Sequence, residues 1–414
     1  MNNMFLRHAL LLFLALRVGD FVGVAAGMWF VPKYVSPEEI GAVLPATSFA
    51  VFLSLPVFAF AMTAMKESAC LAADGETGKI KSLLCGVFVS SAILLAAVLS
   101  VASFAVPRFL SALGISNATA GSLAVLAGFL GCVAPVYTDA LQSLKKFGSL
   151  AAIETVGALA RFAAMAATMP FFGLAGYFAG QAVLPAFRMA GSVSALRREL
   201  SVKSAPFWNA AAARRMTRSF IAILVYQAAP MACALAEQSV LRVCLDPGAS
   251  AGYYMATRFS DFLYCLTFPL LLAMFPYTAG ASRKGGDTRP FVVKCSLLAL
   301  SAAAAMSAAY AFFGRDLLSL MPSGPRYADY ARYMPLLTAV TALTSCQVFY
   351  TNAEVSAGRF GFLRWFVPLH AAYPAALCLA AHSGICGSLD AFLAWFAAAA
   401  ALRFIFSAVA LEST

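Results

Sequence analysis

The sequence predicts an all-α polytopic membrane protein with twelve transmembrane helices in two six-helix halves. Hydrophobic residues make up 62% of the 414 positions, charged residues make up 11%, and the mean hydropathy is +0.82. A soluble chain of this kind carries about 25% charged residues. Apolar runs of about 20 residues, the length that crosses a bilayer core of about 30 Å, recur throughout. A weak internal repeat relates the two halves of the chain.

The first apolar run, "MNNMFLRHALLLFLALRVGDFVG", resembles a signal peptide at first sight. However, Arg17 and Asp20 interrupt its apolar core, and no A-x-A cleavage site precedes a soluble domain. We therefore expect a first span that is retained. In chain order, the apolar runs predict helices at about 9–31, 41–65, 82–106, 119–143, 150–171, 173–196, 218–241, 250–277, 291–313, 331–352, 360–381 and 388–410.

The distribution of basic residues predicts that both termini are cytoplasmic. With the N-terminus inside, the inner loops hold 18 of the 29 lysines and arginines, and the outer loops hold 6. Cytoplasmic loops carry this excess of lysine and arginine in membrane proteins. The net charge of +11 therefore reports membrane topology, and we expect no nucleic-acid partner.

The longest loop divides the chain into three parts. We expect an N-terminal six-helix lobe at 1–196, a basic cytoplasmic linker at 197–217 and a C-terminal six-helix lobe at 218–414. The stretch "SAPFWNAAAARR" within the linker is amphipathic enough to lie on the cytoplasmic headgroups. A solvated connection is the equally good alternative. None of the loops is long enough to fold as a catalytic domain.

An internal repeat supports the two-lobe organisation. At an offset of 210 residues, "PEEIGAVLPATSFAVFL" (37–53) aligns with "PGASAGYYMATRFSDFL" (247–263). At a slightly different offset, "KFGSL" (146–150) echoes "RFGFL" (359–363). Each match alone is weak, and together they indicate two copies of one unit. Because six helices separate the copies, both halves enter the membrane in the same orientation.

The repeat singles out a charged pair inside the eighth predicted span. Arg258 and Asp261 are three residues apart, so they lie on one face of a helix. Their counterparts in the first half are Ser48 and Val51, so the fold does not require charge at this depth. Ionisable groups inside membranes face a bundle interior or a water-filled cavity and mark function. The alternative is an ion pair that only holds helices together.

Other ionisable residues lie inside predicted spans. Arg17 and Asp20 repeat the three-residue spacing on the first span, and Arg161 lies near the midplane of the fifth, where snorkelling is hardest. Arg188 and Arg403 are candidates either for interfacial anchors or for cavity residues. We expect Glu237 to pair with Arg242 and His370 to be a buried neutral histidine; these assignments are structural.

Several classes of protein are excluded by what the sequence lacks. It contains ten cysteines but no CxxC pair, so we expect neither a disulfide framework nor a metal site. The sequence has no phosphate-binding P-loop, because "GETGK" has the wrong spacing, and no Ser/His/Asp arrangement. We therefore expect a protein that is not an enzyme and needs no cofactor.

Four stretches together resemble the multidrug/oligosaccharidyl-lipid/polysaccharide exporter superfamily and, within it, the polysaccharide (O-antigen-type) flippases. They are "YVSPEEIGAVLPATSFAVFLSLP" (34–56), "ALQSLKKFGSLAAIETVGALARF" (140–162), "GLAGYFAGQAV" (173–183) and "GYYMATRFSDFLYCLTFPLLLAMFPYTAGASRKGGDT" (252–288). The resemblance implies two six-helix lobes around a central cavity. The peptidoglycan-precursor flippases of this superfamily have two further helices, which is a departure from the twelve predicted here.

The resemblance also implies a function. Such a flippase moves a polyprenyl-diphosphate-linked oligosaccharide from the inner to the outer leaflet of the bacterial cytoplasmic membrane by alternating access. Membrane lipids, and the glycosyltransferases or polymerase of the same pathway, are the partners implied. Arg17, Arg161 and Arg258 would attract the diphosphate, because guanidinium groups bind its oxygens bidentately. Asp20 and Asp261 would orient these arginines or couple transport to a proton or sodium gradient.

Two other functions remain open. A cation-coupled multidrug exporter of the same superfamily is the first, although such an exporter favours acidic residues facing cationic drugs, whereas the spans here favour arginine. The second is a membrane glycosyltransferase or polymerase. It would need catalytic acids on an outer loop, and the outer loop at 314–330 is short, with Asp316 and Asp329 as its acidic residues.

Overall fold

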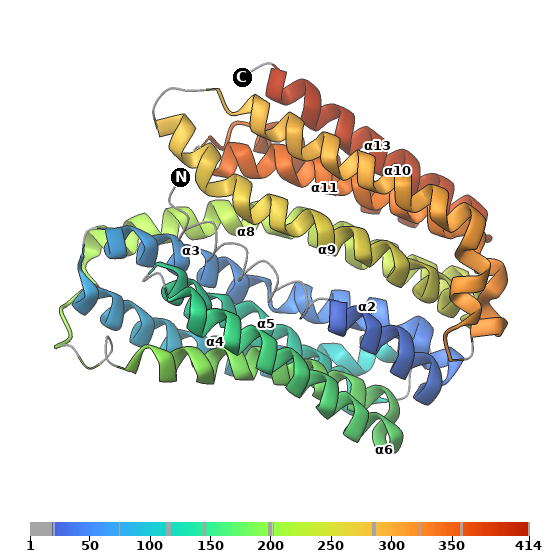
Figure 1. Ribbon diagram of the computed structural model, residues 1–414, viewed down its shortest axis with the longest axis horizontal. Coiled ribbons are helices and arrows are strands. Elements are labelled where there is room, and N and C mark those ends of the chain that lie inside the picture. Colours follow the sequence, from blue (N-terminus) through green and yellow to red (C-terminus); the bar gives the residue numbers. More distant parts are fainter. Residues whose placement is uncertain are drawn as a thin grey trace. The chain divides into compact units, whose positions relative to one another are not determined.

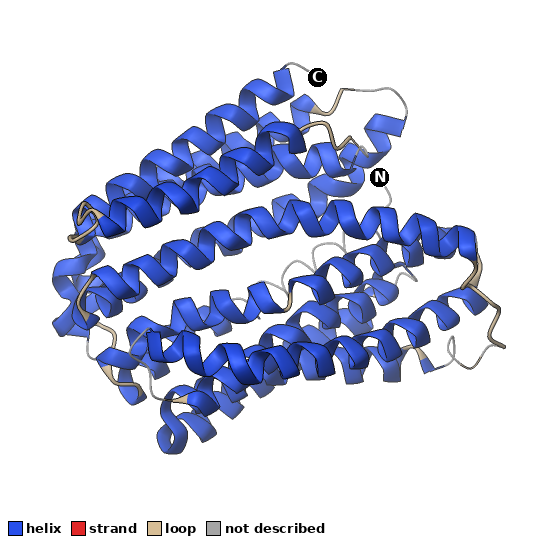
Figure 2. Cartoon of the chain, turned by 180° about the vertical axis from the view of Figure 1, so that it is seen from behind, coloured by secondary structure: helices blue, strands red, loops and turns tan. Residues whose placement is uncertain are grey.

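The chain forms helices almost throughout. The computed structural model describes residues 19, 21–73, 75–112, 117–143, 146–197, 201, 203–283, 287–322, 324–356 and 359–412, and within these ranges it contains no strand (Figures 1 and 2). Residues 21–34 are helical. They are followed by α2 (Pro37–Leu53), α3 (Leu55–Ala73), α4 (Thr77–Ala112), α5 (Ala118–Ser143), α6 (Phe147–Ala195), α8 (Ala210–Cys244), α9 (Pro247–Arg283), α10 (Arg289–Ser319), the 3-10 helix η1 (Gly324–Tyr333), α11 (Met334–Ser356), α12 (Leu363–His382) and α13 (Leu389–Glu412).

The predicted fold class is confirmed: this is an all-α, multi-pass membrane protein. In the described ranges each predicted span overlaps a helix, and the ends differ by up to eight residues. Two of the predicted spans, 150–171 and 173–196, lie in the single element α6, where Gly173 breaks the helix with a φ of 50°. Glycine adopts this positive φ readily because it has no Cβ. The predicted second span is a bent pair, in which α2 and the start of α3 meet at 56°.

Length and hydropathy support membrane insertion of the described helices. Six of them are apolar and long enough to cross a bilayer, and the bent pair of α2 with α3 makes a seventh. Large apolar side chains on their outer faces are open to the surroundings; Phe104, Phe171 and Phe312, for example, retain 68%, 80% and 80% of their surface. In water such surface would be costly, whereas lipid tails cover it without penalty.

The chain divides into two compact units. Unit 1 consists of residues 1–26 and 45–231, and unit 2 consists of residues 27–44 and 232–414. In unit 1, α5 packs against α3, α4 and α6. Its core includes Leu83 from α4, Leu141 from α5 and Leu150 from α6, each at most 1% exposed. The six-helix lobes at 1–196 and 218–414 stay a prediction.

In unit 2, α11 packs against α9, α10 and α13, and η1 packs against α10 and α9. Val292 of α10 and Phe349 of α11 are at most 1% exposed. The rings of η1 follow its geometry: Tyr327, Tyr330 and Tyr333 are three residues apart, and a 3-10 helix has three residues per turn. Their ring centroids are 6.5 and 6.3 Å apart in succession.

Residues 203–209 of the predicted linker are not helical, and most of them are exposed, but Phe207 is only 4% exposed and packs on the core of unit 1. The amide of Ala205 donates to the Gly78 carbonyl at 3.2 Å. Asn209 then caps α8, since its side chain accepts a bond from the Ala212 amide at 2.8 Å.

Candidate functional site

Arg258 and Asp261 form the ion pair that their spacing predicts. Both project from α9 in unit 2, and Nη1 of Arg258 lies 3.0 Å from Oδ2 of Asp261. The Arg258 guanidinium also lies over the ring of Tyr254, 4.9 Å from its centroid, within the range of a cation–π contact. The Asp261 side chain is 30% exposed and the Arg258 side chain is 19% exposed.

Gly27 borders this pair. A methyl group at this position would lie 3.5 Å from the Tyr254 hydroxyl and 4.0 Å from Cδ of Arg258, so the helical residues that begin unit 2 pass close to the arginine. Tyr254 itself is fully buried. Arg258 is therefore held by Asp261 on its own helix, by an aromatic ring one turn earlier and by the helix that carries Gly27.

Arg161 of α6 reaches the backbone of the first predicted span within unit 1. Its Nη2 donates to the carbonyl oxygen of Gly19 at 2.9 Å. The guanidinium rests against Gly23, where a methyl group would lie 2.7 Å from Cζ and 3.1 Å from Nη1 of Arg161. Arg17 and Asp20, the other predicted site residues of this span, lie outside the described residues.

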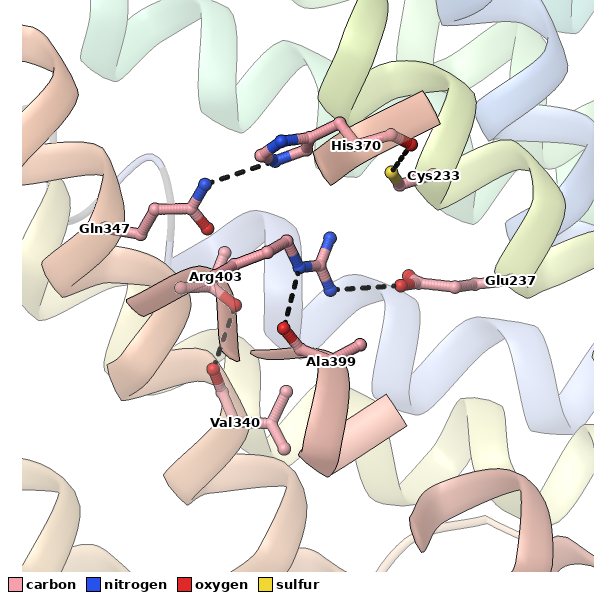
Figure 3. Close-up of polar contacts among 8 residues, drawn as sticks. Cys233, Glu237, Val340, Gln347, His370, Ala399 and Arg403 are labelled. Atoms are coloured by element: carbon pink, nitrogen blue, oxygen red, sulfur yellow. Dashed lines mark hydrogen bonds and ion pairs between the residues drawn. The ribbon is translucent and has the colours of Figure 1, made fainter. Parts of the chain in front are cut away.

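A second polar cluster, which the sequence did not reveal, lies in unit 2 (Figure 3). The prediction that Glu237 pairs with Arg242 is wrong: Oε1 of Glu237 lies 3.3 Å from Nη2 of Arg403. Arg403 comes from α13 and Glu237 from α8, and they are 8% and 6% exposed. Arg403 is therefore a buried ion-pair partner, and the interfacial-anchor interpretation does not hold for it. Its Nε donates to the Ala399 carbonyl at 3.2 Å.

Residues of α12 and α11 complete this cluster. The ring of Tyr373 lies under the Arg403 guanidinium, 4.9 Å from its central carbon. His370 has Nδ1 2.8 Å from the Phe366 carbonyl oxygen and Nε2 3.1 Å from the side-chain nitrogen of Gln347. A carbonyl only accepts, so Nδ1 carries the proton and Nε2 accepts from the Gln347 amide. This geometry supports the predicted neutral histidine.

Arg188 also has a carboxylate partner. Its Nε and Nη2 donate to the two carboxylate oxygens of Glu154 at 2.8 and 2.7 Å, and both residues belong to α6 in unit 1. This is the bidentate geometry that makes arginine–carboxylate pairs strong. Glu154 is 4% exposed, so this pair is largely shielded from the surroundings on its carboxylate side.

Three of the described arginines predicted inside spans are paired with carboxylates. Arg258, Arg188 and Arg403 each contact a carboxylate, and the described hydrogen bond of Arg161 goes to a backbone carbonyl. Within the part of the chain that the structure describes, no group of three or more His, Cys, Asp or Glu residues has the geometry of a metal site. Guanidinium and carboxylate groups of this kind bind charged groups by electrostatics.

Comparison with known proteins identifies the fold. Neither a family model nor a curated protein matches this chain. Among solved structures, an inward-facing multidrug resistance MATE family transporter of the MOP superfamily matches with a TM-score of 0.67 and 13% identity, over 95% of each chain. The outward-facing conformation of such a transporter matches with a TM-score of 0.62 and 14% identity, over 99% of this chain and 95% of that one.

A third matching structure is a transporter whose binding pocket is described as different. It is a MOP superfamily transporter from Pyrococcus furiosus, described as having a pocket of reverse polarity that suggests a different function. It matches with a TM-score of 0.64 and 13% identity, over 98% of this chain and 96% of that one. At this level of identity the likeness concerns the fold, and the chain has the fold of the MATE transporters of the MOP superfamily.

Proposed function

We propose that this protein is an alternating-access membrane transporter and that it exports amphiphilic organic compounds, as multidrug transporters do. The observation that carries the proposal is the full-length likeness to multidrug transporters, described in inward-facing and in outward-facing conformations. A chain with this fold can present one binding site to each side of a membrane in turn. The basic inner loops support a cytoplasmic location for both termini.

The geometry of the α9 pair supports a cationic substrate. The Arg258 guanidinium contacts the Tyr254 ring and the Asp261 carboxylate, and the Asp261 side chain is 30% exposed. An organic cation that reaches this pair can therefore contact the Asp261 carboxylate. In a low-dielectric site, a charge-assisted contact of this kind is stronger than in water. Asp261 would bind the substrate or a coupling proton or sodium ion, and Arg258 would hold the carboxylate in place.

The test is transport of a fluorescent organic cation, ethidium, by the purified protein in liposomes that carry a pH or a sodium gradient. We expect the wild type to move ethidium and Asp261→Asn to lower the initial rate at least about tenfold, the effect of losing about 1.4 kcal/mol of binding. Asp390→Asn is the matched control, because Asp390 also pairs with an arginine at 3.5 Å but is 69% exposed. A wild type that moves no ethidium, or a control variant as impaired as Asp261→Asn, would contradict this substrate class.

A lipid-linked oligosaccharide flippase is the second candidate. Arg258 and Arg161 favour it, because guanidinium groups in a low-dielectric site bind diphosphate oxygens. The fold also accommodates such a change of charge, since the Pyrococcus furiosus protein is described as having reverse pocket polarity. The substrate would then be a polyprenyl-diphosphate-linked oligosaccharide, made and consumed by glycosyltransferases or a polymerase in the bacterial cytoplasmic membrane.

Lipid analysis of a strain that lacks this protein separates the two candidates. A flippase predicts that a polyprenyl-diphosphate oligosaccharide accumulates on the cytoplasmic side, and that wild type but not Arg258→Ala relieves it. An exporter of organic cations predicts unchanged lipid pools and an altered tolerance to such cations. Truncated glycans that never polymerise would count against both candidates.

A further inference from the structure

A buried carboxylate in unit 2 is neutralised by the chain itself. Glu237 on α8 and Arg403 on α13 are 6% and 8% exposed, and their nearest charged atoms lie 3.3 Å apart (Figure 3). A carboxylate at such burial needs a compensating proton, cation or basic side chain. Here an arginine supplies the charge, and arginine does not lose its proton in proteins. The positive charge beside Glu237 is therefore permanent.

Arg403 is fixed in this position by three different contacts. Nη2 pairs with Glu237, Nε donates to the Ala399 carbonyl one turn earlier on α13, and the Tyr373 ring lies 4.9 Å from its central carbon. The planar guanidinium suits this combination, because its N–H groups donate within its plane while an aromatic ring stacks on its face. The position that a small cation would take beside the carboxylate is thus filled by a side chain from the neighbouring helix.

The other titratable groups around Glu237 are neutral near pH 7. The Tyr373 ring of α12 lies against the Arg403 guanidinium. Cys233 lies one turn earlier than Glu237 on α8, and its thiol donates to the His370 carbonyl at 3.1 Å. His370 is held in a neutral tautomer by its two hydrogen bonds. Among the described groups, Arg403 therefore supplies the positive charge.

We propose that Arg403 is the resident cation of a carboxylate site, and that it excludes protons and alkali cations from Glu237. Removing the guanidinium leaves the Glu237 carboxylate without its counter-charge and frees the Ala399 carbonyl; carboxylate and backbone carbonyl oxygens are ligands that hard cations prefer. Arg403→Met would thus turn the pair into a site that takes a proton or Na⁺. For the proposed transport function, this means that a coupling ion would bind at a site other than Glu237.

The experiment is thermal unfolding of the purified full chain in detergent. Wild type, Arg403→Lys, Arg403→Met and the double variant Glu237→Gln/Arg403→Met are compared in sodium chloride and in choline chloride at equal ionic strength, at acid and at alkaline pH. No substrate is present, so the outcome does not depend on whether the transport proposal holds.

We expect the midpoint of wild type, and of Arg403→Lys, to be the same in both salts. Arg403→Met should lose about 5 °C or more in choline at alkaline pH, because one partner of a buried pair is removed. It should recover in sodium chloride or at acid pH. The double variant, which has no charge at either position, should regain most of the loss and should respond to neither condition.

Two results would overturn the proposal. One is a wild type stabilised by sodium in a manner that Glu237→Gln abolishes, since the carboxylate would then already bind a cation. The other is an Arg403→Met variant that folds with no dependence on salt or pH. If Arg403→Met fails to fold, the double variant decides: the proposal predicts that it folds, and failure of both would show that Arg403 does not act as the counter-charge of Glu237.

Discussion

Replacing Gly23 by alanine would place a methyl group where the Arg161 guanidinium lies. The new carbon would be 2.7 Å from Cζ of Arg161, whereas carbon atoms in good contact are about 3.5–4.0 Å apart. The guanidinium must therefore move by about 1 Å, which breaks its 2.9 Å bond to the Gly19 carbonyl. A hydrogen bond with a charged donor contributes about 1.5–3 kcal/mol. Alanine gives back about 0.5–1 kcal/mol, because it favours the helix over glycine, so the net cost is about 1–2 kcal/mol.

A double-mutant cycle with Arg161→Ala isolates this contact. In the Arg161→Ala background the methyl group meets no guanidinium, so Gly23→Ala should be neutral or stabilising by about 0.5–1 kcal/mol. The sign of the effect thus reverses between backgrounds, and the coupling energy is about 2 kcal/mol. The assay is unfolding of the purified variants in mixed micelles by a denaturing detergent. Gly131→Ala is the control, because a methyl group there meets nothing within 4 Å. An equal cost of Gly23→Ala in both backgrounds would refute the reasoning.

Two further predictions concern the inner end of unit 1. Gly86→Ala should displace the Trp208 indole, since a methyl group would lie 2.6 Å from its Cζ2. We expect limited proteolysis within residues 203–209 to become several-fold faster. An unchanged rate would contradict the packing of this segment. Arg215 binds both carboxylate oxygens of Glu67, at 2.8 and 2.7 Å, but its side chain is 57% exposed. Solvent weakens such a pair, so Glu67→Gln should lower the free energy of unfolding by only about 1 kcal/mol. Glu76→Gln, in an exposed pair, should cost close to nothing, and equal costs for the two variants would refute the role of burial.

The helices could be predicted from the sequence because the bilayer imposes one rule on all of them. In lipid every backbone amide and carbonyl must bond within the chain, so an apolar run of about 20 residues becomes a helix regardless of its neighbours. The break at Gly173 was also predictable, since the run from 150 to 196 is too long for one crossing and a glycine lies at its middle. Phe207 had no such signal: a single phenylalanine in a basic linker does not indicate whether it packs on a core or on lipid.

The buried Glu237–Arg403 pair could not be predicted because counting residues gives a poor estimate of depth. Glu237 is four residues from the outer end of its predicted span and Arg403 is fifteen from the outer end of its own, which places them about 6 and 22 Å deep in upright helices. In the structure α8 continues to Cys244, so Glu237 lies seven residues from the end of its helix. The long side chain of Arg403 spans the remaining offset between the two positions. Tilt and overhang of helices are set by packing, and this information is absent from an apolar run.

The charge pairs alter what the intramembrane arginines can do. A guanidinium that already holds a carboxylate must release it before it binds a diphosphate, and in a low-dielectric site an unpaired buried charge costs several kcal/mol. Arg258 thus becomes free for an anion only when Asp261 is protonated or has another cation as its partner. Arg403 has no such release while Glu237 stays buried beside it. An anionic substrate therefore requires a cation at Asp261 at the same moment, whereas a cationic substrate is itself that cation. The Arg258–Asp261 pair could therefore serve either kind of transporter. Whether the substrate takes the place of Arg258 at Asp261, or of Asp261 at Arg258, distinguishes a cation exporter from a diphosphate flippase.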